Sequence, residues 1–419
     1  MPHLVDYQGL FMSKSPSIFG GAMIIAGTAI GAGMLANPTA TAGVWFSWSL
    51  LLFAYTWLCM YASGLMILEA STTFSSNANL STIVKSLLGN GWNTVNSLSL
   101  VFVLYILLYA YITSGGGLTA SHLSALIGTD IAPRLGSLII SVLFAVFVWL
   151  STRVVDRVAS VLMIGMITSF FISAFGMMSS VSLDTLFDTH APTGTAYTPY
   201  IWVALSTVLV SFGYHIGVPS MVKYFGGDTA KVAKSVLIGS LMALTFYLLW
   251  QVVVQGNLPR TDFAPVIAKD GDVATLLGAI GKSGFIGTML GAFAYMALTS
   301  SFLGVALGLF DFLSDFFGFG DDKTGRAYAV AVVFLPPLVL SLIAPFGFTT
   351  AIGFAGLALT VWGVIVPALL AKAHRQKYPD STYRAFGGQF MIYFVIVFGV
   401  INIIAQIGGY LGVVPSFGG

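Results

Sequence analysis

Eleven apolar stretches, each long enough to cross a lipid bilayer, decide what this chain can fold into. A spanning α-helix needs about 20 apolar residues, and inside lipid every backbone N–H and C=O must be bonded within the protein. Only 8% of the 419 residues are charged, whereas a soluble domain has about 25%. We therefore expect an all-α integral membrane protein with about eleven transmembrane helices. The expected spans are 17–39, 44–70, 93–122, 134–151, 157–179, 198–222, 233–255, 284–315, 327–344, 348–371 and 388–412.

The basic residues predict how the spans are oriented, because cytoplasmic loops carry an excess of Lys and Arg. With the N-terminus in the cytoplasm, only four of the 17 basic residues lie outside, namely Arg134, Arg260, Lys269 and Lys282. An odd number of spans then places the C-terminus in the periplasm. Between the spans we expect a short interfacial helix around Leu80–Leu88, and a loop at 256–283 that folds over the outer mouth.

The first apolar stretch carries an unusual concentration of helix-breaking residues. Its segment GTAIGAGM contains Gly27, Gly31 and Gly33, and Asn37-Pro38 follow. Each glycine costs a helix about 1 kcal/mol relative to alanine. An unwound turn at membrane depth is tolerated only where it is buried in protein or lines a cavity. We expect a break in this helix that forms part of a substrate site; the alternative is close helix–helix packing through small residues.

The sixth stretch repeats the pattern in SFGYHIGVPS, Ser211 to Ser220, where Gly213, Gly217 and Pro219 interrupt the apolar run. Segments one and six head two groups of five, so the second group enters the membrane in the opposite sense. Interrupted helices at matching places in two halves point to an inverted repeat around a central site. We expect one domain over residues 1–419, with repeat one about 17–179, repeat two about 198–371 and an extra helix about 388–412.

Six long motifs are spread over nearly the whole chain: IIAGTAIGAGMLANP (24–38), SGLMILEA (63–70), FVLYILLYAYI (102–112), SFGYHIGVPSMVKY (211–224), SSFLGVALGLFDFLSDFFGF (300–319) and IGFAGLALTVWGVIVPALLA (352–371). They resemble the bacterial hydroxy/aromatic amino acid permeases of the amino acid–polyamine–organocation superfamily. SGLMILEA, FVLYILLYAYI, VWLST (148–152) and GNLPR (256–260) are more similar to the tryptophan permeases than to the tyrosine permease. The resemblance implies a LeuT-type 5+5 fold, a bacterial inner-membrane location and uptake driven by the proton gradient.

The expected function is therefore a secondary symporter that imports an aromatic amino acid, with L-tryptophan and a proton as the preferred pair. The alternatives are a tyrosine or broad aromatic permease, or coupling to sodium. A channel would show rings of like residues or a continuous polar pore, and no GxxxxGK[ST] motif is present for an ATP-driven pump. We expect no enzyme activity, no cofactor, no resident metal and no nucleic acid partner, and a protein that works as a monomer in the bilayer.

An amino acid brings two charges, yet the spans offer almost no charged side chains. The free amides of a half-helix N-terminus can hold the carboxylate, and Ile30 to Gly33 supply them here. The ammonium would face carbonyls near Ala26, Gly27 and the Phe212–Tyr214 turn, and Phe212 and Tyr214 could stack on the ring. Thr28, Asn37 and Ser300 are candidates for the acceptor of the indole N–H. The predicted substrate-binding residues are Gly27, Thr28, Ala29, Ile30, Gly31, Ala32, Gly33, Tyr105, Tyr109, Phe212, Gly213, Tyr214 and Ser300.

Few ionisable groups are available for coupling. His215 lies in the second break and titrates near neutrality, although a lone histidine is more often structural. Glu69 and Asp311 lie near the inner ends of spans. They could act as gates, as partners of Lys223, Arg153 or Arg157, or be plain surface charges. Relatives that use sodium imply a cation site from Gly27, Ile30, Ala297, Ser300 and Ser301, while paired serines are also common at helix contacts. The predicted coupling residues are His215, Glu69, Asp311, Ala297, Ser300 and Ser301.

Overall fold

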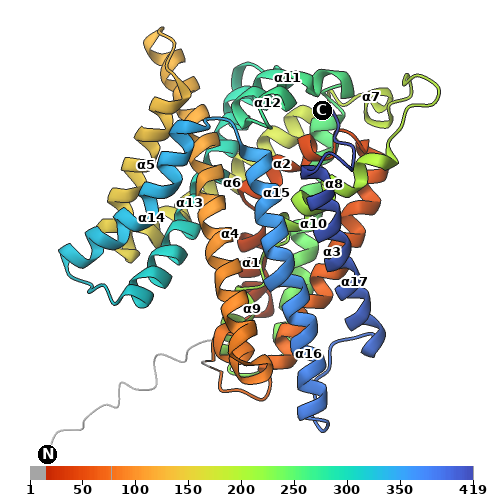
Figure 1. Ribbon diagram of the computed structural model, residues 1–419. Helices are drawn as coiled ribbons and strands as arrows, with labels where there is room; N and C mark the ends of the chain where they lie inside the picture. Colours follow the sequence, from red (N-terminus) through yellow and green to blue (C-terminus); the bar gives the residue numbers. More distant parts are fainter. Residues whose placement is uncertain (1–15, 77, 419) are drawn as a thin grey trace, which may run out of the picture.

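The computed structural model describes residues 16–76 and 78–418 (Figure 1), and every regular element within them is a helix. This confirms the all-α prediction. Eight long helices are α3 (Trp45–Ser71), α4 (Leu80–Ile127), α5 (Pro133–Leu150), α6 (Thr152–Met178), α10 (Thr229–Gln255), α13 (Gly284–Phe317), α14 (Lys323–Ile343) and α17 (Gly388–Tyr410). A ninth runs from α15 (Phe348–Leu359) through a π-helical turn (Thr360–Ile365) into α16 (Val366–Lys377).

Nine helices of the described chain are long and apolar enough to span a membrane, and a broken pair makes a tenth. That pair is α1 (Ile18–Ala29) and α2 (Ala32–Ala40), which meet at an angle of 56°. The stretch expected to be the sixth span is instead two short helices, α8 (Ile201–Ser211), preceded by the 3₁₀ turn Thr198–Tyr200, and α9 (Gly217–Tyr224). The total of eleven spans therefore stays a prediction.

Both predicted interruptions are present. The first is narrower than expected, because the helix is broken only at Ile30–Gly31 and Pro38 lies inside α2. Pro38 is the seventh residue of α2, past the free amides of the first turn, so it leaves the Met34 carbonyl without an intrahelical N–H partner. The second interruption covers residues 212–216. In each case the apolar helix stops near glycine and restarts a few residues later, as the sequence predicted.

The short helix predicted around Leu80–Leu88 is also present. Residues 80–88 are helical, and Gly89 with φ of 86° separates them from the long remainder of α4. A left-handed φ suits glycine because other residues meet a steric penalty there. The Asn79 side chain caps the start of the helix by accepting from the Thr82 N–H at 2.8 Å.

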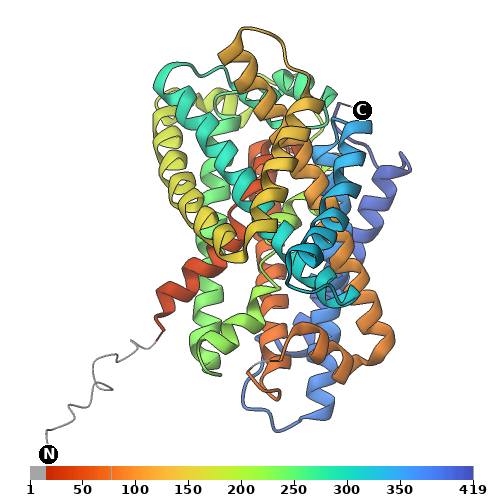
Figure 2. The ribbon, with the colours of Figure 1, turned by 90° about the vertical axis from the view of Figure 1, so that its left-hand side faces the viewer.

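The loop at 256–283 folds into the 3₁₀ turn Arg260–Phe263, α11 (Ala264–Ala268) and α12 (Val273–Ile280). Together with α7 (Leu183–Phe187), these short helices cover the end of the bundle at which α17 finishes (Figure 1). The start of α1 lies at the opposite end, which both views show (Figure 2). The expected cover over one mouth is therefore present.

The broken helices lie in the interior of the bundle. Helix α1 packs against α10, and α2 packs against α8, α10, α13 and α15. Residues 32–39 of α2 are all buried. The outer helices expose large apolar side chains instead, among them Leu138, Val142, Leu335, Val397 and Ile404. An apolar exterior of this size needs a lipid environment.

Candidate functional site at the two broken helices

The start of α2 presents backbone amides at the first break. The Ile30 N–H still bonds to the Ala26 carbonyl at 2.7 Å, so α1 closes normally. The Ala32 N–H instead bonds to the Ser301 hydroxyl of α13 at 3.0 Å. A Cβ placed on Gly31 would overlap with that hydroxyl, so glycine is needed here for close approach. One of the amides predicted to hold a carboxylate is thus capped by a serine side chain.

The second break is lined by fully buried aromatic residues. Phe212 lies edge-on to the ring of Tyr247, with centroids 5.1 Å apart. Tyr214 stacks on His215 at 4.7 Å, and its hydroxyl bonds to the Met60 carbonyl at 3.1 Å. The predicted aromatic residues are therefore present at the break, and Tyr214 is also hydrogen-bonded to α3.

A single hydroxyl joins the two breaks. Tyr247 of α10 is fully buried, and its hydroxyl bonds to the Ala29 carbonyl at 2.8 Å and to the Ser211 carbonyl. These carbonyls end α1 and α8. Nearby, the Ser211 hydroxyl donates to Asn37 Oδ1 of α2 at 2.9 Å. The two interruptions therefore meet at one place, with the negative ends of two helix dipoles directed at one donor.

Two tyrosines predicted to bind the substrate are bonded elsewhere. The Tyr105 hydroxyl donates to the Val332 carbonyl at 3.0 Å, and the Tyr109 hydroxyl donates to the Ala344 carbonyl at 2.9 Å. Both contacts tie α4 to α14 or the turn after it. Thr28 is exposed, and its hydroxyl bonds to the Ile24 carbonyl of its own helix at 2.8 Å. The structure does not bring these three side chains into the break.

The residues of the predicted cation site are only partly gathered. Ser301 reaches the first break, as described above. Ser300 directly precedes Ser301 in α13, and its hydroxyl donates to the Ala297 carbonyl of the same helix at 3.2 Å. Gly27 faces α6, where a Cβ would lie 3.0 Å from Met163 Cε. Only Ser301 of the two serines thus contacts the break, and the coupling ion stays a prediction.

His215 is fully buried in the second break. Its Nε2 lies 2.7 Å from the Ser63 hydroxyl and 3.1 Å from the Met60 carbonyl of α3. A nitrogen that bonds to a carbonyl carries a proton, so this tautomer holds its hydrogen on Nε2. The arrangement fits the structural role and leaves the proton-carrying role untested.

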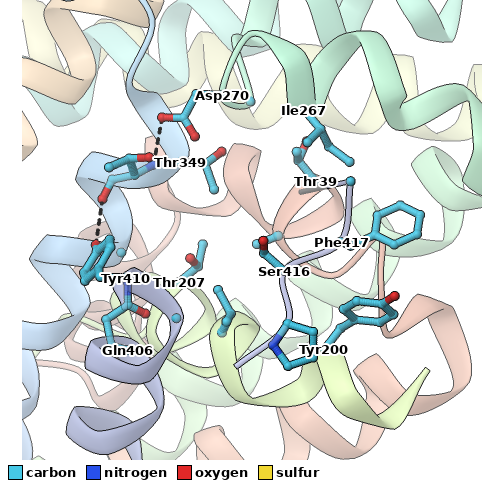
Figure 3. Close-up of a pocket in the computed structure, with 18 residues that line it drawn as sticks. Thr39, Tyr200, Thr207, Ile267, Asp270, Thr349, Gln406, Tyr410, Ser416 and Phe417 are labelled. Carbon is cyan, nitrogen blue, oxygen red and sulfur yellow. Dashed lines mark hydrogen bonds between the residues drawn. The ribbon is translucent and has the colours of Figure 1, made fainter. Parts of the chain in front are cut away.

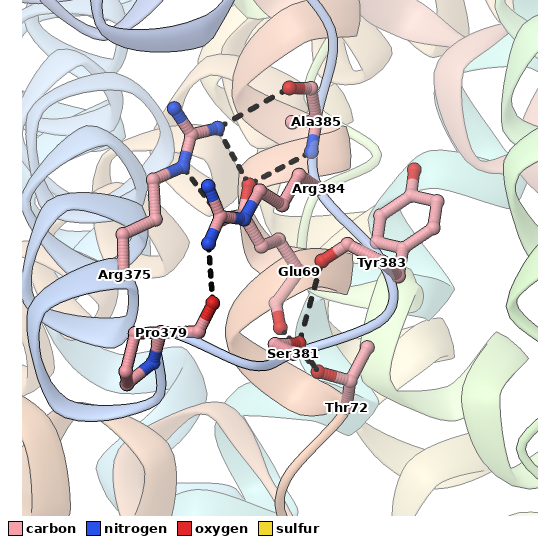
Figure 4. Close-up of polar contacts among 8 residues, drawn as sticks. All are labelled: Glu69, Thr72, Arg375, Pro379, Ser381, Tyr383, Arg384 and Ala385. Atoms are coloured by element: carbon pink, nitrogen blue, oxygen red, sulfur yellow. Dashed lines mark hydrogen bonds and ion pairs between the residues drawn. The ribbon is translucent and has the colours of Figure 1, made fainter.

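Glu69 has a different partner from the ones predicted. Its carboxylate accepts from Arg375 Nε at 2.7 Å and Nη2 at 2.8 Å, and from the Ala385 N–H at 2.8 Å (Figure 4). The pairing with Lys223 or Arg157 was wrong because α16 and the following loop lie closer to Glu69 than α9 or α6. The side chain of Arg153 lies outside the described residues. Asp311 has an exposed side chain on α13.

The Glu69 network extends over the loop after α16. Ser381 lies 3.4 Å from the Thr72 hydroxyl and accepts or donates there, and Arg384 Nη2 bonds to the Pro379 carbonyl (Figure 4). Glu69 is fully buried and the Arg375 side chain is 7% exposed. A bidentate, buried pair of this kind fixes the geometry of its neighbours.

Comparison with known proteins decides the family. The profile of the tryptophan/tyrosine permease family matches residues 14–406. The chain belongs to the tryptophan/tyrosine permease family. It is 56% identical to a tryptophan-specific transport protein of Haemophilus influenzae, over 98% of this chain and all of the relative. It is 45% identical to a tryptophan-specific transport protein of Pseudomonas aeruginosa over 97% and 98% of the two chains. It is 39% identical to the low affinity tryptophan permease of Escherichia coli over 97% and 99%.

Membership confirms the resemblance seen in the sequence motifs. Because the family and these relatives are transport permeases, this chain is a transport protein and not an enzyme. Its apolar helices make it a multi-pass membrane protein with an amino acid as the class of substrate. Sequence reasoning missed Tyr247 and Arg375, because one is a tyrosine among 17 and the other a basic residue near a span end.

Proposed function

We propose that this protein is a secondary active symporter that imports L-tryptophan. The observation that carries the proposal is the meeting of two broken helices at one buried place, where a helix-terminal amide of α2 and the terminal carbonyls of α1 and α8 are held by side-chain hydroxyls. A zwitterion needs donors for its carboxylate and acceptors for its ammonium, and these backbone groups provide both without a buried charge. The relatives named for tryptophan support that substrate.

In this proposal the carboxylate takes the place of the Ser301 hydroxyl at the amides of Gly31 to Gly33, because the Ile30 N–H stays bonded to the Ala26 carbonyl. The ammonium competes with the Tyr247 hydroxyl for the Ala29 and Ser211 carbonyls. The ring of the substrate packs beside Phe212. The proposal keeps the LeuT-type 5+5 inverted repeat, a cytoplasmic N-terminus, a periplasmic C-terminus and alternating access.

The proton gradient is the proposed driving force, with sodium as the alternative because Ser301 lies at the break. One charge moved through about 100 mV yields roughly 2.3 kcal/mol. At 1.4 kcal/mol per tenfold, this supports an accumulation of around fiftyfold. One coupled ion is therefore enough for uptake.

The test is counterflow of labelled tryptophan in proteoliposomes of the full chain. Tyrosine, phenylalanine and indole serve as competitors, under separate proton and sodium gradients. We expect tryptophan counterflow, and accumulation under the proton gradient alone. Accumulation only under a sodium gradient would show that sodium, and not the proton, is the coupling ion. Counterflow of tyrosine without counterflow of tryptophan would show that tyrosine is the substrate.

A further inference from the structure

A cavity of about 430 Å³ lies at the covered end of the bundle, away from the two breaks. Its walls come from α2, α8, the turn after α11, α15, α17 and the last residues of the chain (Figure 3). Thr39 and Thr207 line it, and they lie two and four residues from Asn37 and Ser211 on their helices. The Asn37–Ser211 hydrogen bond therefore lies between this cavity and the breaks.

Polar atoms on the cavity wall lack partners. Thr39 Oγ1 and Gln406 Oε1 belong to side chains that are 7% and 4% exposed, and neither atom has a hydrogen bond with any described residue. Thr349 Oγ1 is a third such atom on the same wall. Buried polar atoms are almost always bonded in folded proteins, so each exception requires an explanation. Two threonine hydroxyls and one amide oxygen at this cavity can all accept hydrogen bonds, which points to a ligand that donates them.

Asp270 adds a carboxylate to this wall. One of its oxygens accepts from the Thr350 N–H at 3.0 Å, which fixes the side chain at the start of α15. The nearest basic neighbour along the chain, Lys269, lies over the ring of Phe346 instead. No ion pair joins Asp270 to a basic side chain within residues 16–76 and 78–418. An ionised carboxylate has room for about four hydrogen bonds, so an ammonium group would complement it.

The opposite wall is aromatic. Figure 3 shows Tyr200 and Phe417 across the cavity from Asp270, Thr349 and Gln406. Their rings are in edge contact with centroids 5.5 Å apart, and the Arg260 guanidinium lies 4.4 Å from the Phe417 ring. Arg260 is held in turn by the Ala42 and Gly43 carbonyls at 3.1 and 2.8 Å. This fixed aromatic wall can take a flat ring by stacking or edge contact.

We propose that this cavity is an outer binding site for the transported aromatic amino acid, which places its ammonium among Asp270, Thr39, Thr349 and Gln406 and its ring against Tyr200 and Phe417. The proposal rests on the proposed function, because the occupant is the substrate of that function. The ligand class is a primary ammonium that carries an aromatic side chain. The Asn37–Ser211 contact then separates this outer site from the central one.

The first experiment measures KM and Vmax for labelled tryptophan in proteoliposomes, and the thermal stability of the same purified variants. Asp270→Asn keeps the shape and the capping acceptor but removes the charge. We expect KM to rise on the order of tenfold or more, because the hydrogen bond to a charged group is lost. Asp262→Asn, an exposed carboxylate on the same loop, is the matched control and should leave KM unchanged.

Thr39→Val separates binding from structure. It removes an unpartnered buried hydroxyl at constant shape, so thermal stability should be kept or raised. If the hydroxyl binds the ammonium, KM rises severalfold in the same variant. A stable Thr39→Val protein with unchanged KM, together with unchanged KM in Asp270→Asn, overturns the outer site.

Tryptamine, which has the ammonium and the ring but no carboxylate, is the second probe. We expect it to inhibit tryptophan uptake by the wild type, and about tenfold less effectively by Asp270→Asn. Equal inhibition of both proteins would contradict the ammonium site. If the wild type shows no tryptophan counterflow at all, the proposed function fails first. Normal wild-type counterflow with unaffected variants refutes the outer site alone.

Discussion

Replacing Tyr247 with phenylalanine removes a hydroxyl that contacts both broken helices. A tyrosine hydroxyl has a single proton, yet it contacts the Ala29 and the Ser211 carbonyls. Tyr247→Phe keeps the ring that packs on Phe212 and leaves both buried carbonyls without this donor. An unsatisfied buried acceptor costs about 1–3 kcal/mol, so the arrangement that joins the breaks should lose about 5- to 150-fold in population.

The assay combines thermal unfolding of the purified protein with counterflow of labelled tryptophan. We expect Tyr247→Phe to unfold at a lower temperature and to show a reduced counterflow rate, because the half-helices are no longer held in register. Tyr393→Phe is the matched control. It makes the same chemical change at an exposed ring on α17 and should alter neither measurement.

One result would refute this reasoning. If Tyr247→Phe matched the wild type in both stability and counterflow, the shared hydroxyl would not hold the breaks together. The two carbonyls would then be satisfied by other means, and the Asn37–Ser211 hydrogen bond would remain as a link between the broken helices. A variant that loses stability but keeps its counterflow rate would limit the Tyr247 hydroxyl to a stabilising role.

Three further outcomes are expected. Gly31→Ala should reduce the amount of folded protein in the membrane because its Cβ overlaps with the Ser301 hydroxyl, and the double variant Gly31→Ala/Ser301→Ala should recover yield by removing that oxygen, as measured by fluorescence-detected size exclusion. Glu69→Gln should destabilise the protein by about 3–5 kcal/mol, since it leaves Arg375 buried without its counter-ion, and thermal unfolding measures this. Burial raises the pKa of Asp270 above about 3.9, so the folded protein binds this proton more tightly than the unfolded chain. Its contribution to stability is present at low pH and is lost as the pH rises through the raised pKa; Asp270→Asn should remove that part of the pH dependence of unfolding.

The breaks were predictable because glycine and proline act locally. Gly31, Gly213 and Gly217 lie in apolar stretches, where clustered glycines weaken a helix and an unwound turn needs a protein or cavity environment. Gly89 likewise ends the interfacial helix through its own backbone conformation. These signals need no knowledge of distant residues, and the structure bears them out.

The partners of the site residues were not predictable in the same way. Thr28 looked like an acceptor for an indole, but the phase of α1 turns it outward and its hydroxyl bonds one turn back. Tyr105 and Tyr109 share a face as expected, and that face meets α14 instead of a break. Glu69 and Arg375 are 306 residues apart in sequence. Helix packing decides which of several basic residues pairs with a carboxylate, and the local sequence does not predict the partner.

The π-helical turn between α15 and α16 has a consequence for the Glu69–Arg375 pair. Such a turn holds one residue more than an α-helical turn, and one residue corresponds to about 100° of rotation at 3.6 residues per turn. Every side chain of α16 therefore points about 100° away from the direction that it would have if α15 continued as a regular α-helix. Arg375 faces the carboxylate only because of this extra residue ten positions earlier. Deleting one residue from 360–365 would swing the guanidinium away from Glu69 and break the buried ion pair between α16 and α3.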